Sequence, residues 1–278
     1  MEMKINQADV RRFAQHLFIE EKSAVTVEKY SRDAARFALW LDGREATKEL
    51  VISYKQQLVQ AGYAVRSVNS MLSSVNSFLS FLGLDCCRVK CLRAQRQIYC
   101  AEEKELSKAE YMRLLAAAEN KPRTRLLLET ICGTGIRVSE LQYFTVEAVR
   151  RGDVTVACKG KSRTILVPGK LRALLLGFAK KCGVKSGAIF RTRGGQPMDR
   201  SGIWREMKKL CKRAQVNPKK VFPHNLRKLF ARTFYRAERD IAKLADILGH
   251  SSINTTRIYI ISTGVEHRHK IERLGLIV

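Results

Sequence analysis

The first 121 residues contain no proline, and their apolar residues recur at the spacing of one helix face. All five prolines of the 278-residue chain lie at or after Pro122. Because proline breaks helices, a proline-free stretch with this spacing favours consecutive helices. The pattern predicts four helices, at residues 9–22, 26–41, 47–61 and 67–82. Thr26 is the expected N-cap of the second, and the N-terminal part is expected to be a helical bundle.

A basic stretch follows this bundle. It contains four basic residues and no acid: Arg88, Lys90, Arg93 and Arg96. Ser107 and Glu110 then form the S-x-x-E pattern of a helix capping box. We therefore predict an N-terminal helical domain at 1–90, a linker at about 85–105 and a second domain at 105–278.

The second domain is predicted to be mainly helical with one small β-sheet. Helices are expected at residues 107–119, 123–132, 201–216, 225–237 and 240–248, with Gly249 capping the last. Two short β-type runs, at 154–158 and 164–167, flank the basic sequence K-G-K-S-R, which predicts a hairpin. The expected fold class is mainly α with a small β-sheet, in which an α+β domain follows the helical bundle.

The chain carries a formal net charge of +26, from 52 Lys and Arg against 26 Asp and Glu. Most of this excess lies after residue 100, where 37 basic residues stand against 16 acidic ones. Positive charges in this excess repel one another unless a polyanion, such as nucleic acid or an anionic lipid surface, neutralises them. The sequence therefore indicates a polyanionic partner that is bound mainly by the second domain.

The longest stretch without formal charge, residues 67–84, holds eight Ser or Asn residues and is not expected to span a membrane. Residues 1–10 contain no apolar run and no export cleavage site, so a cytoplasmic protein is expected. The eight cysteines include no C-x-x-C pair. They are expected to be thiols rather than parts of a disulfide or zinc framework.

Three sequence patterns contain residues that suit phosphate chemistry. Arg137 follows a glycine turn in T-G-I-R-V-S-E-L, where a guanidinium group at a helix start can hold a phosphate oxygen. A lysine on the hairpin turn, Lys159 or Lys161, can protonate a leaving oxygen. His224 and Arg227 in P-H-N-L-R fall on one helix face and offer one titrating and one permanent cation.

A fourth pattern, L-G-H-S-S-I-N-T-T-R-I-Y, holds His250 and Tyr259. A tyrosine hydroxyl is a weak nucleophile at neutral pH unless nearby cations stabilise the phenolate. Each pattern taken alone also fits a structural role, such as an ion pair between Arg137 and Glu140 or a core position for Tyr259. Their combination in one basic domain favours chemistry.

The order Arg, Lys, His-x-x-Arg, Gly-His, Tyr resembles the tyrosine recombinase (phage integrase) family, and the similarity extends over nearly the whole chain. The resemblance implies that Arg137 and Arg227 clamp the scissile phosphate and that Tyr259 is the nucleophile. It implies that Lys159 is the general acid, with Lys161 on the same turn as the alternative. His224 and His250 would assist proton transfer and orient the phosphate.

The same resemblance implies the activity. A simple two-domain member would be a site-specific DNA recombinase that cuts and rejoins double-stranded DNA through a 3′-phosphotyrosyl intermediate, for integration, excision or resolution. Two guanidinium groups can stabilise the transition state without a metal, so no cofactor and no metal site are expected. Family members act as a tetramer on their DNA recombination sites.

The chain departs from the family pattern at two places. The helix at 67–82 has no basic residue where members usually carry them facing the DNA, so its grip is expected to be weaker or to use Ser and Asn donors. Lys228 stands where many members have a second histidine. The residues expected to contact DNA besides the catalytic set are Arg66, Arg88, Lys90, Arg93, Arg96, Lys161 and Arg163.

Two other functions remain open from sequence alone. A DNA-binding regulatory protein with the same fold would lack strand exchange, and a type IB topoisomerase would use the same nucleophile without a sequence requirement. The apolar C-terminal tail is expected to dock either on a neighbouring subunit or on its own domain. Its apolar residues are Ile271, Leu274, Leu276 and Ile277.

Overall fold

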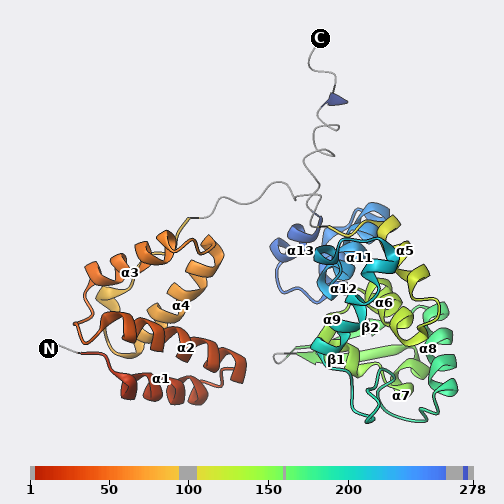
Figure 1. Cartoon of the computed structure of the whole chain (residues 1–278), viewed down its shortest axis with the longest axis horizontal. Helices are drawn as coiled ribbons and strands as arrows, with labels where there is room; N and C mark the ends of the chain where they lie inside the picture. Colours follow the sequence, from red (N-terminus) through yellow and green to blue (C-terminus); the bar gives the residue numbers. More distant parts are fainter. Residues whose placement is uncertain (1–3, 94–104, 159–160, 261–271, 275–278) are drawn as a thin grey trace. The chain divides into compact units, whose positions relative to one another are not determined.

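The computed structural model describes residues 4–93, 105–158, 161–260 and 272–274. The chain divides into two compact units, residues 1–96 and 97–278, and each is considered by itself (Figure 1). In the described ranges, no helix is both long enough and apolar enough to cross a bilayer. The six cysteines whose side chains are described are free.

Four helices form the first unit, as predicted. They are α1 (Gln7–Ile19), α2 (Ala24–Leu41), α3 (Lys48–Gln60) and α4 (Val65–Phe81), followed by the short 3₁₀ helix η1 (Asp85–Cys87). Their apolar faces enclose a core in which Phe13, Phe37 and Phe78 are fully buried. Burial of such faces, rather than helix propensity, holds a bundle of this size together.

The N-cap of α2 is Ser23, so the prediction of Thr26 was wrong. The Ser23 hydroxyl accepts a hydrogen bond from the Thr26 backbone N–H at 3.3 Å. Thr26 is therefore the third residue of the helix. Both residue types can cap, and the serine occurs one turn earlier than the apolar stripe indicates.

Three polar side chains of α4, those of Asn69, Ser74 and Asn76, bind other parts of the first unit. The Asn76 amide donates to the Val89 carbonyl and accepts from the Val89 N–H, at 2.8 and 3.0 Å. Asn69 makes the same pair of bonds with Leu92, at 2.9 and 2.8 Å. Ser74 bonds to Asp33. For these three residues, the expectation that Ser and Asn donors replace basic residues toward DNA does not fit, because their polar groups are bonded within the unit.

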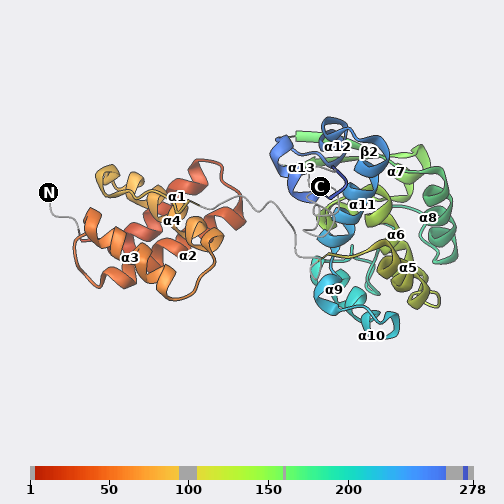
Figure 2. The ribbon, with the colours of Figure 1, turned by 90° about the horizontal axis from the view of Figure 1, so that it is seen from above.

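The second unit contains most of the remaining elements, and its fold class agrees with the prediction. Its helices are α5 (Lys108–Ala117), α6 (Pro122–Thr134), α7 (Val146–Arg151), α8 (Gly169–Lys181), α9 (Arg200–Lys208), α10 (Cys211–Ala214), α11 (Pro223–Glu238), α12 (Ile241–Leu248) and α13 (Ile253–Ile260). Two 3₁₀ helices, η3 (Val138–Tyr143) and η4 (Pro218–Lys220), complete the described helical elements. Helices α6 and α11 pack side by side in the middle of the unit, and α8 lies outside them against α6 and α7 (Figure 1, Figure 2).

The predicted hairpin is present as β1 (Asp153–Cys158) and β2 (Lys161–Leu166), which are antiparallel. The last pair in the register is Cys158 with Lys161, so β1 ends where predicted and β2 begins three residues before the predicted start at residue 164. The row of Val154, Val156 and Ile165 is buried, and Arg163 stands opposite Val156. An arginine therefore occupies a position in the core-facing row of the hairpin.

Three helices of the second unit were not predicted, namely α7, α8 and α13. Helix α8 begins at Gly169 and contains a second glycine, Gly177. Because glycine is typical of turns, the apolar stripe of Leu171, Leu175 and Ala179 was not recognised as helical. The helix predicted at 201–216 is interrupted. The Leu210 N–H bonds to Met207, three residues back, and this tightened turn separates α9 from α10.

Candidate active site

Arg137 is placed by a sharp turn between α6 and η3. Helix α6 ends at Gly135, whose φ is +65°. A Cβ atom there would also overlap the Phe230 ring of α11, so only glycine fits. Arg137 is the N-cap of η3, and its Nη1 pairs with Glu140 Oε1 at 3.0 Å. The predicted functional position and the ion pair with Glu140 are thus both present.

Arg227 extends from α11 into the interior and is 2% exposed. Its Nη1 donates to the Gly135 carbonyl at 2.6 Å and its Nη2 to the Leu248 carbonyl at 2.7 Å. Burial, and then the positive charge of Arg137, lower the pKa of Arg227 to about 10. The group remains a cation at neutral pH, held by backbone dipoles.

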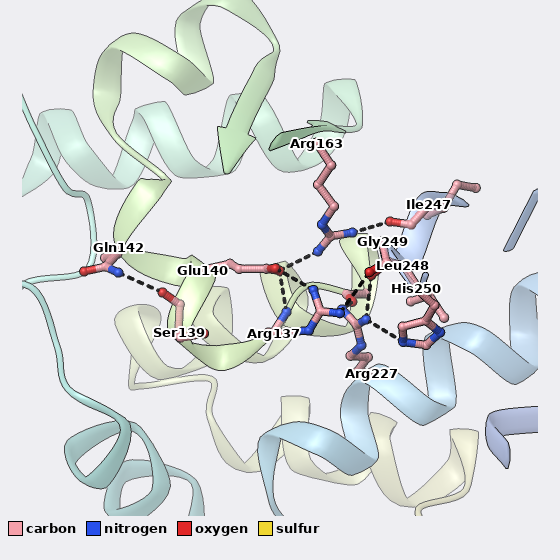
Figure 3. A network of polar contacts seen from close by, with 11 residues as sticks. Arg137, Ser139, Glu140, Gln142, Arg163, Arg227, Ile247, Leu248, Gly249 and His250 are labelled. Carbon is pink, nitrogen blue, oxygen red and sulfur yellow. Dashed lines mark hydrogen bonds and ion pairs between the residues drawn. The ribbon is translucent and has the colours of Figure 1, made fainter. Parts of the chain in front are cut away.

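The carboxyl end of α12 receives three arginines (Figure 3). Each of three consecutive carbonyls accepts from a different one: Ile247 from Arg163, Leu248 from Arg227, and Gly249 from Arg137. The last carbonyls of a helix carry partial negative charge, which favours cations. Glu140, whose side chain is 4% exposed, accepts from Arg137 and also from Arg163 at 2.5 Å. One carboxylate and one helix end therefore gather three guanidinium groups.

His250 follows this helix end, and its ring is fixed at both nitrogens. Nε2 lies 3.0 Å from Arg227 Nη2, and Nδ1 lies 2.8 Å from the Thr256 hydroxyl. Because an arginine can only donate, Nε2 accepts, and we assign the proton to Nδ1, which donates to Thr256. Burial, followed by the charge of Arg227, lowers the pKa of His250 to about 4. The ring is therefore neutral at pH 7.

Tyr259 is carried by α13 into the same place. Its ring centroid lies 5.1 Å from that of His250 and 5.2 Å from that of His224. The residue is 8% exposed and packs against Ala231 and Leu248. Desolvation, then the charges of Lys228 and Arg227, lower the pKa of His224 from its usual value. The tyrosine thus lies between two imidazoles.

An open pocket of about 780 Å³ is lined by four of the predicted catalytic residues. Its wall includes Arg137, His224, Arg227 and Tyr259, together with residues of α9. Among the described residues, no cluster of His, Cys, Asp and Glu has the make-up of a metal site. What the pocket offers is a tyrosine hydroxyl beside guanidinium groups and neutral imidazoles, which suits transfer of a phosphodiester to that hydroxyl.

Five of the six predicted catalytic residues therefore meet at one place: Arg137, His224, Arg227, His250 and Tyr259. Lys159 lies outside the described residues. Its alternative, Lys161, is the first residue of β2. Sequence reasoning did not identify Thr256 as the partner of His250. The R-x-x-E spacing of Arg137 and Glu140 was the available signal for the carboxylate.

The residues expected to contact DNA differ in their surroundings. Four lie exposed on the first unit, namely Arg66, Arg88, Lys90 and Arg93, with Arg88 paired to Asp85. Arg96 lies outside the described residues. Arg163 does not fit the expectation, because its side chain is 15% exposed and its guanidinium group bonds within the unit. Lys228, at the position where many members have a second histidine, lies 4.0 Å from the buried Glu105.

The chain is similar to known proteins over nearly its whole length. The model of the "Phage integrase family" matches residues 104–264, and that of the "Phage integrase, N-terminal SAM-like domain" matches residues 10–84. Tyrosine recombinase XerA of Pyrococcus furiosus is 28% identical, over 95% of this chain and 93% of its own length. Tyrosine recombinase XerD of Pseudomonas aeruginosa is 30% identical, over 90% of this chain and 91% of its own length.

Solved structures share the fold. The XerH site-specific recombinase bound to palindromic difH substrate, a post-cleavage complex, gives a TM-score of 0.72 at 15% identity, over 98% of this chain and 84% of that one. A lambda integrase tetramer bound to a Holliday junction also gives 0.72, at 17% identity, over 91% of this chain and 76% of that one. The fold and site define an enzyme with a tyrosine nucleophile. The chain belongs to the phage integrase, or tyrosine recombinase, family.

We expect Gly249→Ala to destabilise the second unit more than an ordinary glycine substitution. Gly249 has a φ of +63°, and an added Cβ would lie 2.5 Å from Arg163 Cδ. Gly183 has a similar φ of +68° with open space around it. Urea unfolding should therefore show a loss of about 1 kcal/mol for Gly183→Ala, from backbone strain alone, and a clearly larger loss for Gly249→Ala. Equal losses would contradict the packing of Arg163 against this turn.

We also expect the His250 ring to remain neutral well below pH 6.5. In an NMR titration of labelled histidine, its pKa should be near 4 in the folded chain and in the usual range in the urea-unfolded chain. Because only the unfolded form takes up this proton between those values, stability falls as pH falls, by at most about 1.4 kcal/mol per pH unit. A folded-state midpoint near 6.5 would contradict the burial of the His250 ring beside Arg227.

Proposed function

We propose that this chain is a site-specific DNA recombinase that cuts and rejoins double-stranded DNA through a 3′-phosphotyrosyl intermediate. The observation that carries the proposal is the position of Tyr259, between His224 and His250 in a pocket walled by Arg137 and Arg227. The net charge of +26 supports a polyanionic substrate. The family relatives carry the names of tyrosine recombinases.

Arg137 and Arg227 hold the scissile phosphate. The three gathered guanidinium groups and the one Glu140 carboxylate leave two positive charges in excess. The transition state of phosphodiester transesterification carries about two negative charges on its oxygens, so the charges match. Because the guanidinium groups are already fixed by carbonyls, little reorganisation is needed when the phosphate arrives.

Tyr259 attacks the phosphorus, and the phenolic proton passes to a neighbouring base. Both imidazoles are unprotonated at neutral pH, because burial and the neighbouring cations lower the pKa of each, and His224 is the better acceptor. His250 already accepts from Arg227 at Nε2 and carries its proton at Nδ1, so its role is to orient that arginine. His224 thus takes the proton transfer and His250 the orienting role, whereas the family resemblance assigned both roles to both histidines.

The new bond joins the tyrosine oxygen to the 3′-phosphate, and the bond to the 5′-oxygen breaks. The hairpin lysine, Lys159 or its alternative Lys161, protonates the departing 5′-oxygen. The phosphotyrosyl ester keeps the energy of the broken bond. The 5′-hydroxyl of a second strand can therefore reverse the step without ATP, and that reversal joins the strands in a new combination.

Exchange between two duplexes requires four such sites, so the chain is proposed to act as a tetramer on its DNA recombination sites. The lambda integrase tetramer bound to a Holliday junction supports this assembly. The apolar C-terminal tail is proposed to dock on a neighbouring subunit. Of its apolar residues, Leu274 is described and is 62% exposed, whereas Ile271, Leu276 and Ile277 lie outside the described residues. The chain is proposed to work in the cytoplasm, on the nucleoid.

The test uses the DNA that the protein itself selects. Tyr259→Phe chains are captured with their bound DNA, the recovered fragments are sequenced, and a nicked suicide substrate is built on the shared site. The wild-type chain should form a covalent adduct on this substrate, because the cut strand diffuses away. Tyr259→Phe should bind with equal affinity, since only the nucleophilic oxygen is removed, and should form no adduct.

The two alternative functions give different results. Binding to the selected site without any adduct from the wild-type chain would indicate a regulatory DNA-binding protein. An adduct on any sequence, with relaxation of supercoiled plasmid that lacks the site, would indicate a type IB topoisomerase. Either result would overturn the proposal.

A further inference from the structure

Arg163 is a buried cation that contributes charge to the proposed site but has no contact with the phosphate in the proposed mechanism. Its side chain leaves the core-facing row of β2 and is 15% exposed. Nη2 donates to Glu140 Oε2, and Nη1 donates to the Ile247 carbonyl (Figure 3). A charged group is costly to bury unless it is paired and hydrogen-bonded, and the Nη1 and Nη2 atoms of Arg163 meet these conditions. Because burying an arginine among apolar residues costs free energy, its presence in this row indicates a role that a valine could not perform.

The bonds of Arg163 link three elements that carry functional residues. Glu140 belongs to η3, which begins beside Arg137. Ile247 belongs to the end of α12, which leads through Gly249 to His250. Arg163 itself lies on β2, two residues beyond Lys161 and four beyond Lys159. One side chain therefore connects the hairpin to both walls of the phosphate site.

The planar guanidinium group suits this task. It presents donors in two directions at once, to a carboxylate and to a carbonyl, whereas a lysine offers a single flexible ammonium group. Gly249 leaves the space that the Arg163 side chain fills, because a Cβ atom there would overlap Cδ and crowd Nε at 2.9 Å. The glycine of the L-G-H string and this arginine are thus parts of one packing arrangement.

We infer that Arg163 is a positioning residue that fixes the hairpin against Glu140 and the end of α12, and so sets the place of the general acid relative to the clamped phosphate. The inference rests on the proposed function, in which the hairpin supplies that acid. Arg163 acts through the lysine and does not touch the DNA. Its removal is expected to slow mainly one step, protonation of the leaving 5′-oxygen, because Glu140 still pairs with Arg137 and the end of α12 still binds Arg137 and Arg227.

The test replaces the leaving oxygen. In a suicide substrate with sulfur in place of the bridging 5′-oxygen, the departing thiolate is a weak base with a pKa of about 8.5 and needs no general acid. At saturating protein, Arg163→Met should slow cleavage of the oxygen substrate by about 10- to 100-fold, within the range that general acid catalysis supplies. On the sulfur substrate the cleavage rate of Arg163→Met should return to within about threefold of the wild-type rate. Lys159→Ala and Lys161→Ala should recover in the same way if they lack only the general acid.

Two further variants keep the test decisive. Arg163→Lys retains the charge beside Glu140 and should show the same rescue by sulfur if Arg163→Met does not fold. Arg151→Met removes an exposed arginine at the end of α7, which pairs with Asp153 at the start of β1, and should leave both rates unchanged. A rate within about threefold of wild type on the oxygen substrate, or a defect that persists on the sulfur substrate, would overturn the inference.

Failure of the proposed function gives a separate result. If the wild-type chain forms no adduct with either substrate, the recombinase proposal itself fails. If Lys159→Ala or Lys161→Ala is rescued by sulfur and both Arg163 variants are not, the general acid stands and only the role of Arg163 is wrong.

Discussion

The carboxyl end of α12 holds the active site together. Its last carbonyls accept from three arginines that come from η3, β2 and α11, which are distant in the sequence. Guanidinium groups this close repel one another, and the lowered pKa of Arg227 reflects that repulsion together with its burial. The helix end and the Glu140 carboxylate offset it only in part. A bound phosphate would neutralise the positive charge that remains.

The same arrangement explains the neutral histidines. Each imidazole lies among permanent cations and is partly removed from water, and both effects disfavour a further positive charge. A neutral His250 can accept from Arg227 and hold it, and a neutral His224 can receive a proton from Tyr259. The arginines therefore bind phosphate and also set the protonation state of the bases.

Much of the fold could be predicted from the sequence, because the four helices of the first unit carry clear apolar stripes. The site residues could be grouped because their strings resemble those of one family. The surroundings of each side chain could not be derived in this way. Arg163 stands in a basic turn sequence and was expected to contact DNA, yet the register of β2 directs it inward to Glu140. The Ser and Asn side chains of α4 were one of two options for its contact with DNA, the other being a weaker grip, because the sequence does not show that Asn69 and Asn76 bind backbone of their own unit.

One chain brings these residues together, since the Tyr259 ring lies against those of His224 and His250 of the same molecule. A complementation experiment mixes Arg137→Ala chains with Tyr259→Phe chains on one suicide substrate. Neither variant has a complete pocket, so the mixture should form no covalent adduct beyond that of each variant alone. Efficient adduct formation by the mixture, on the Arg137→Ala chain, would mean instead that the tyrosine acts in a neighbour's pocket.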